Sequence, residues 1–151
     1  MDVNEDFVDI AATFVENDVE FVVVGAYALA AHGFPRATGD IDLFVNPTPE
    51  NAARVLRALA DFGAPIAAHG VKERDFEVEG QVYQLGLPPR RIDILTSLSG
   101  ITFDEAAAEA IEGSLGPVKV RFIGKRAMAR NKLASGRPKD LADAQLLEDD
   151  E

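Results

Sequence analysis

Apolar residues recur every three or four positions in several stretches of the chain, which is the spacing of one helix face. The first of these stretches contains Phe7, Ile10 and Phe14 and predicts an amphipathic helix near the N-terminus. A later one is followed by Gly63 and Pro65, residues that commonly stop helices. The helices predicted from spacing and composition cover roughly residues 4–17, 26–32, 50–62, 103–111, 125–134 and 138–147.

Short β-branched or alternating runs lie between these helices and predict strands. A turn at Glu79-Gly80 also predicts a hairpin within residues 76–85. Strands interspersed with helices indicate an α/β (α+β) fold, with a mixed sheet, helices packed against it and a helical pair at the C-terminus. The predicted strands cover residues 21–24, 40–45, 91–95 and 118–123.

The composition is that of a globular protein. The 151 residues are 47% hydrophobic and 27% charged, so we expect one domain spanning residues 1–151. No apolar run approaches the roughly 20 residues that a membrane-spanning helix needs, and the acidic N-terminus does not resemble a signal peptide. We therefore expect a cytoplasmic protein with no membrane partner. The absence of cysteine excludes disulfides and thiolate metal sites.

Charge is distributed unevenly along the chain. The net charge of −11 argues against a surface built for non-specific nucleic-acid binding. Between Pro117 and Lys139, however, there are eight basic residues and no acidic one. A run of this kind is commonly just a solvated face. In so acidic a chain it also suits a compact anion, such as a nucleoside triphosphate, and Lys132, Arg137 and Lys139 are its candidate phosphate contacts.

Three aspartates lie on two predicted strands. In Asp40-Ile41-Asp42 the alternation places both carboxylates on one face, roughly 6.6 Å apart along the strand. Asp93 alternates with Ile92 and Ile94 in the same way. If the two strands are neighbours, the three carboxylates converge, and a divalent cation would relieve their repulsion. The alternatives are a solvated strand face for the first pair and a salt bridge to Arg90 or Arg91 for Asp93.

Upstream of these aspartates, a predicted strand runs through Gly25 directly into a helix. A glycine at such a junction lets a phosphate approach the backbone, although it also simply permits a tight turn. The order strand, glycine, helix and Asp-x-Asp strand is more specific than any of its parts.

The chain resembles the polymerase-beta-type nucleotidyltransferase superfamily, and within it small bacterial nucleotidyltransferase-like proteins related to abortive-infection toxins and minimal nucleotidyltransferases. The resemblance spans roughly residues 5–147. The stretches that carry it are Val24-Gly25-Ala26-Tyr27-Ala28, His32-Gly33, Arg36-Ala37-Thr38-Gly39-Asp40-Ile41-Asp42, Arg91-Ile92-Asp93-Ile94-Leu95-Thr96 and Asn131–Asp143.

The resemblance implies a nucleotidyltransferase-like fold and Mg²⁺- or Mn²⁺-dependent transfer of a nucleoside monophosphate from a triphosphate to a hydroxyl. The resemblance does not identify the acceptor, which could be a protein, an RNA or a small molecule. Asp40, Asp42 and Asp93 would bind the metal ions, and Asp93 could also assist deprotonation of the acceptor. Two metal ions would stabilise the attacking oxygen and the departing pyrophosphate.

Nucleotide contacts are expected from several further residues. Arg36 and Thr38, on the loop before the Asp-x-Asp strand, are candidates for touching a phosphate or the acceptor, although Arg36 could equally pair with a surface acid. Gly25 and Ala26 would offer backbone N–H groups. Many active members of the superfamily have Ser or Gly where this chain has Ala26, which cannot donate a hydroxyl. We expect Lys132 to face the three aspartates across a groove.

A second interpretation is a binding module that keeps the fold with little or no catalysis, such as a toxin–antitoxin partner. The intact carboxylates favour the enzyme. The alanine at position 26, the small size and the lack of an evident acceptor-binding domain favour the module.

Overall fold

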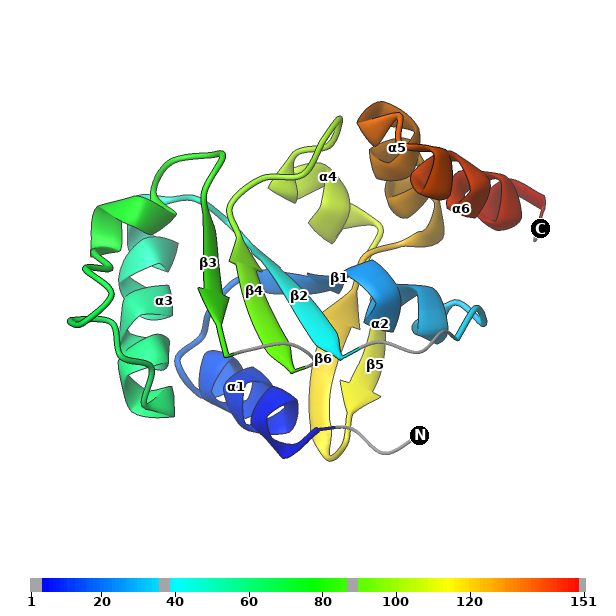
Figure 1. Ribbon diagram of the computed structural model, residues 1–151. Helices are drawn as coiled ribbons and strands as arrows, with labels where there is room; N and C mark the ends of the chain where they lie inside the picture. The colour runs from blue at the N-terminus through cyan, green and yellow to red at the C-terminus, as the bar shows by residue number, and fades with distance from the viewer. Residues whose placement is uncertain (1–3, 36–38, 87–89, 150–151) are drawn as a thin grey trace.

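A six-stranded mixed sheet lies at the centre of the computed structural model, which describes residues 4–35, 39–86 and 90–149 (Figure 1). Its strand order is β3-β4-β2-β1-β6-β5, with β2 parallel to β4 and β1 parallel to β6, and the other pairs antiparallel. The mixed sheet predicted from the sequence is confirmed. The strands are β1 (Phe21–Val24), β2 (Asp40–Val45), β3 (Val82–Leu85), β4 (Arg91–Leu95), β5 (Ile111–Leu115) and β6 (Val118–Phe122).

The helices begin and end at residues suited to those positions. Thr48 accepts a hydrogen bond from the backbone of Asn51 at the start of the third helix, and Gly63 ends that helix in the left-handed conformation. None of the helices in the described residues is long and apolar enough to cross a membrane. They are α1 (Glu5–Glu16), α2 (Gly25–Ala31), α3 (Pro49–Phe62), the 3₁₀ helix η1 (Glu73–Phe76), α4 (Phe103–Ala108), α5 (Lys125–Ser135) and α6 (Pro138–Asp149).

The two faces of the sheet have different roles. On one face, Phe14 of α1 packs edge-to-face against Phe21 of β1, with ring centroids 5.4 Å apart, and α1 lies against α3. On the opposite face, Phe44 of β2 packs against Phe103 of α4, with ring centroids 5.3 Å apart. Because side chains alternate along β2, Asp42 shares this second face with Phe44. Helix α4 therefore covers this face near the C-terminal end of β2. The part of the face around Asp42, toward the start of the strand, can hold a functional site.

Polar contacts hold the C-terminal helices beside that site. His32, at the end of α2, contacts the carbonyl oxygen of Ile123 through Nε2 at 2.7 Å, just before α5 begins. Asn131 of α5 donates to the carbonyl oxygen of Ser99 at 3.0 Å. As a result, α5 and α6 lie together at one end of the molecule, next to α2 and α4 (Figure 1).

Two details of the predicted elements are wrong. The segment 76–85 is not a hairpin, because Phe76 is buried at the end of η1 and only Val82–Leu85 forms a strand, which pairs with β4. The turn at Gly80 exists, but its N–H donates to the hydroxyl of Ser97 instead of closing a two-stranded ribbon. The helix expected over 103–111 ends earlier, at Ala108, and the strand β5 that begins at Ile111 was not predicted.

Candidate functional site

Strand register brings the three aspartates together on one sheet face. In the parallel pair of β2 and β4, Asp42 lies opposite Asp93, and Asp40 lies opposite Arg91. On the other side of β2, Val24 is the register partner of Asp42. The carboxylates therefore gather where β1 passes into α2. A parallel pairing in this register places both strands' aspartates on the same face at the same level.

Gly25 makes room for one of these carboxylates. Its φ of 70° lies in the left-handed region, which side chains with a Cβ disfavour. A Cβ at this position would also collide with Oδ2 of Asp42. Because Gly25 has no side chain, the carboxylate of Asp42 can lie directly against the start of α2.

Burial and mutual repulsion change the protonation of Asp42. Burial has the largest effect, followed by the charge of Asp93 and a hydrogen bond with it, and together with the charge of Asp40 they raise the pKa of Asp42 to about 7. The positive charge of Arg91 acts in the opposite direction. With a pKa of about 7, the carboxyl group of Asp42 is partly protonated near neutral pH, and it forms a hydrogen bond with Asp93.

Arg91 lies between the other two carboxylates. Its Nη2 is 3.3 Å from Oδ2 of Asp40, and its Nε is 3.2 Å from Oδ1 of Asp93. The backbone N–H of Arg91 also donates to Oδ1 of Asp40 at 3.3 Å. The ion pair considered as an alternative for Asp93 is thus present. In the part of the chain that the structure describes, no group of three or more His, Asp or Glu side chains is arranged as a metal site.

A cleft of about 650 Å³ joins the aspartates to the C-terminal helices. Asp40, Asp42 and Asp93 line it together with Gly25 and Ala26. Lys132, Arg137 and Lys139 line the same cleft from α5, α6 and the turn between them. The structure therefore brings these predicted site residues around one cavity. Arg36 and Thr38 lie outside the described residues.

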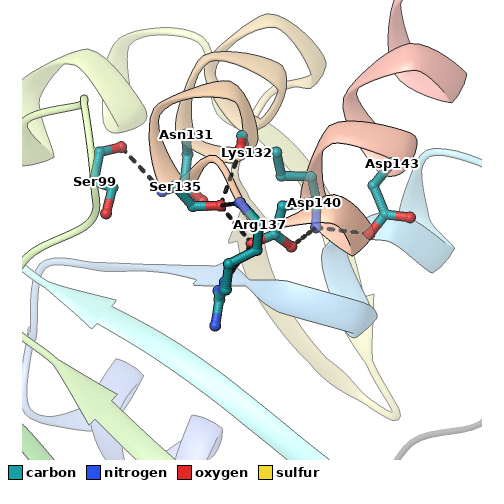
Figure 2. Close-up of polar contacts among 7 residues, drawn as sticks. All are labelled: Ser99, Asn131, Lys132, Ser135, Arg137, Asp140 and Asp143. Atoms are coloured by element: carbon teal, nitrogen blue, oxygen red, sulfur yellow. Dashed lines mark hydrogen bonds and ion pairs between the residues drawn. The ribbon is translucent and has the colours of Figure 1, made fainter.

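Lys132 is part of a buried network rather than a free cation. Its Nζ is 3.0 Å from Oδ2 of Asp143 and 3.5 Å from Oδ1 of Asp140, and its side chain is 12% exposed (Figure 2). Burial pushes the pKa of Asp140 up, but the hydrogen bond from Ser135 and the charges of Lys132 and Arg137 outweigh it and hold that pKa below its usual value. The network fastens α5 to α6.

Three other residues of the basic run also form ion pairs. Arg126 lies 3.7 Å from Glu109, and Arg130 lies 3.0 Å from Glu105. Arg137 contacts Asp140 at 2.9 Å, although its side chain is 78% exposed. The acidic partners lie outside the run, before it at Glu105 and Glu109 and after it at Asp140, so the charge count within the run overstated the free positive charge. Of the cleft cations, Lys139 is exposed and has no acidic partner among the described residues.

Some lining residues were not identified from the sequence. Val82 and Gln84 of β3 contribute to the cleft beside Asp93, because Gln84 is the register partner of Asp93. The hairpin predicted within 76–85 did not place these residues beside β4, although the alternation of residues 82–85 indicates a strand. Asp143, which is 4% exposed, could have been suspected from its helical spacing after Asp140.

Comparisons with known proteins bear on the fold and on the family of the chain. The fold is similar to a solved structure from Thermotoga maritima, a candidate nucleotidyltransferase, with a TM-score of 0.61 and 15% identity over 94% of this chain and 89% of that one. A comparison with curated proteins found no match. Residues 9–151 match the family described as nucleotidyl transferase AbiEii toxin, type IV TA system. This chain belongs to the AbiEii nucleotidyltransferase toxin family.

Proposed function

We propose that this protein is a metal-dependent nucleotidyltransferase that moves a nucleoside monophosphate from a nucleoside triphosphate to a hydroxyl group of an acceptor. The observation that carries the proposal is the convergence of Asp40, Asp42 and Asp93 on one sheet face, in a cleft that Lys139 also lines. Carboxylates and a cation on a shared cavity match the opposite charges of a metal–triphosphate complex.

The reaction balances without any further reagent. The acceptor hydroxyl oxygen forms a bond to the α-phosphorus, and the bond from that phosphorus to the oxygen bridging to the β-phosphate breaks. Pyrophosphate leaves, and the hydroxyl proton passes to a carboxylate or to water. Asp93 is the candidate for receiving that proton, because it lies at the level of Asp42 on the neighbouring strand.

The donor set suits a divalent cation. The aspartates supply hard oxygen ligands, which Mg²⁺ and Mn²⁺ prefer. The charges of Asp93 and Asp40 contribute to the raised pKa of Asp42, and a bound cation would relieve this repulsion. Asp40, Asp42 and Asp93 would hold the metal, which when bound neutralises charge on the attacking and departing oxygens. Arg91 would have to leave at least one of its two carboxylates for all three to act as ligands.

Position-specific labelling tests the proposal. A triphosphate labelled at the α-phosphorus should transfer label to an acceptor in a cell lysate, whereas one labelled at the γ-phosphorus should transfer none. Asp93→Asn should remove the transfer, and Asp104→Asn, an exposed α4 residue, is the matched control. Transfer of the γ-label, or transfer that survives Asp93→Asn, would contradict the proposal.

A catalytically weak binding module is the second candidate. Two observations favour it: Arg91 already compensates Asp40 and Asp93, and Ala26 lines the cleft without a hydroxyl. Ala26→Ser should then turn weak transfer into stronger transfer by adding a donor for the triphosphate. If neither the wild type nor this variant transfers label while both bind the triphosphate, the module is the better description.

The family description also suggests a partner. We propose that the chain acts as the toxin of a toxin–antitoxin pair, with nucleotide transfer to the acceptor as its harmful activity and an antitoxin that counteracts it. Induced expression should slow growth, and Asp42→Asn should abolish that effect at equal protein level. Unchanged toxicity of the variant would separate the toxic effect from the carboxylate site.

A further inference from the structure

One polar side chain continues the row of site residues toward the sheet edge. Strand pairing places Asp42, Asp93 and Gln84 at the same level on three adjacent strands, β2, β4 and β3. Side chains at paired positions share a face, and their Cβ atoms are about 5 Å apart on neighbouring strands. Gln84 is therefore the next side chain after Asp93 along this row, on the side away from Asp42.

Gln84 is available for a ligand. Its side chain is exposed and lines the cleft, and it makes no hydrogen bond to any residue in 4–35, 39–86 or 90–149. An exposed glutamine on an edge strand is commonly just solvated. This one lines the cavity that holds three carboxylates, and its amide can donate a hydrogen bond to a hydroxyl group or accept one from it.

The cleft differs in charge on the two sides of the aspartates. Three cations line it from α5, α6 and the turn between them, namely Lys132, Arg137 and Lys139. Asp140 and Asp143 line the same side and pair with Lys132 and Arg137, so Lys139 is the cation there without an acidic partner in the described residues. The residues that β3 and the end of β4 add beside Asp93 are uncharged, namely Val82, Gln84, Leu95 and the following Ser97. Ser97 belongs to this side because its hydroxyl accepts the N–H of Gly80, just before β3. A triphosphate suits the side of Lys139, and an uncharged group suits the side of β3.

The geometry of phosphoryl transfer connects these observations. The attacking and leaving oxygens lie roughly in line on opposite sides of the phosphorus. If pyrophosphate departs on the side of Lys139, the acceptor approaches from the side of β3. We infer that Gln84 is a positioning residue for the acceptor, holding the uncharged, hydroxyl-bearing end of that molecule beside Asp93. This inference rests on the proposed transfer reaction.

The edge position of β3 is consistent with such an approach. No further strand flanks β3 on its outer side in the described part of the chain. An acceptor larger than the cleft can therefore extend past the sheet edge while its reacting hydroxyl lies beside Gln84. The triphosphate, in contrast, is contained between the aspartates and the C-terminal helices.

The test separates acceptor binding from nucleotide binding. Transfer of α-label is measured across a dilution series of lysate acceptors, with portions treated by ribonuclease or protease to define the acceptor class, and triphosphate affinity is measured separately with Mn²⁺. Gln84→Ala and Gln84→Met should raise the apparent KM for acceptor about tenfold or more and leave the triphosphate Kd within about twofold. Gln84→Asn, which keeps the amide, should recover part of the loss.

Gln81→Ala is the matched control, since Gln81 is an exposed glutamine outside the cleft lining whose hydrogen bonds to Thr96 come from its backbone. If the wild type transfers label and the Gln84 variants behave like Gln81→Ala, this inference is overturned and the proposed function is not. Equal losses of acceptor and triphosphate binding would also overturn it. A wild type that neither binds triphosphate nor transfers label would overturn the proposed function and this inference together.

Discussion

Asp42 and Asp93 occupy matched positions on the parallel strands β2 and β4, and their carboxyl groups share a hydrogen bond. Burial and the neighbouring charge raise the pKa of Asp42 to about 7, well above that of an unfolded aspartate. Between about pH 4 and pH 7 the folded protein thus holds a proton that the unfolded chain has released, and the folded state loses stability as the pH rises.

Asp42→Asn should therefore stabilise the metal-free protein, and more so at higher pH. We expect the gain in unfolding free energy to be about 2 kcal/mol larger at about pH 8 than at about pH 5. Urea denaturation at both pH values measures it, with the exposed Asp104→Asn as control. A gain that does not change with pH would show that Asp42 is ionised throughout.

Arg91 is expected to oppose metal binding, because its guanidinium contacts Asp40 at 3.3 Å and Asp93 at 3.2 Å. Arg91→Ala should lower the stability of the metal-free protein by roughly 1–3 kcal/mol, since two partly buried carboxylates lose their counter-charge. Mg²⁺ should then raise the melting temperature of the variant more than that of the wild type.

Arg57→Ala, an exposed α3 residue without an acidic partner in the described chain, is the control for a general change of charge. Direct Mn²⁺ titration followed by electron paramagnetic resonance gives the affinities. Weaker Mn²⁺ binding to Arg91→Ala would mean that the guanidinium supports the metal ligands instead of competing with the metal.

Lys132 is expected to matter first for stability. Lys132→Met leaves Asp143, which is 4% exposed, without its lysine partner and should cost about 3–5 kcal/mol. Combining it with Asp143→Asn should recover part of the loss, as calorimetric or denaturant unfolding would measure. Additive losses in the double variant would show that the two side chains do not depend on each other.

Lys139 is the better candidate for a direct phosphate contact, because it is exposed on the cleft and has no acidic partner in the described residues. Lys139→Ala should weaken triphosphate binding by about 1–2 kcal/mol, roughly tenfold, with little effect on stability. Lys119→Ala on β6 is exposed and outside the cleft lining. An equal loss of triphosphate affinity in both variants would show that only the overall charge of the protein matters. Added salt would then remove the effect.

Much of the site followed from the sequence, because period-two alternation on β2 and β4 determines which face Asp42 and Asp93 share. The order of strands could not be derived so directly, and it is what placed Gln84 beside Asp93. Charge counting failed for the basic run, since the partners of Lys132 and Arg130 lie outside that run and meet them only after helix packing.

We expect Asp40, Asp42 and Asp93 to hold a metal ion and the triphosphate in the cleft that Lys139 lines. A crystal structure with Mn²⁺ and a triphosphate that cannot be cleaved between its α- and β-phosphates tests this most directly, because anomalous scattering locates the Mn²⁺. We expect Mn²⁺ between the three carboxylates, Arg91 displaced from at least one of them, and the β- and γ-phosphates on the side of Lys139. Mn²⁺ bound away from these aspartates, or a triphosphate outside the cleft, would contradict it.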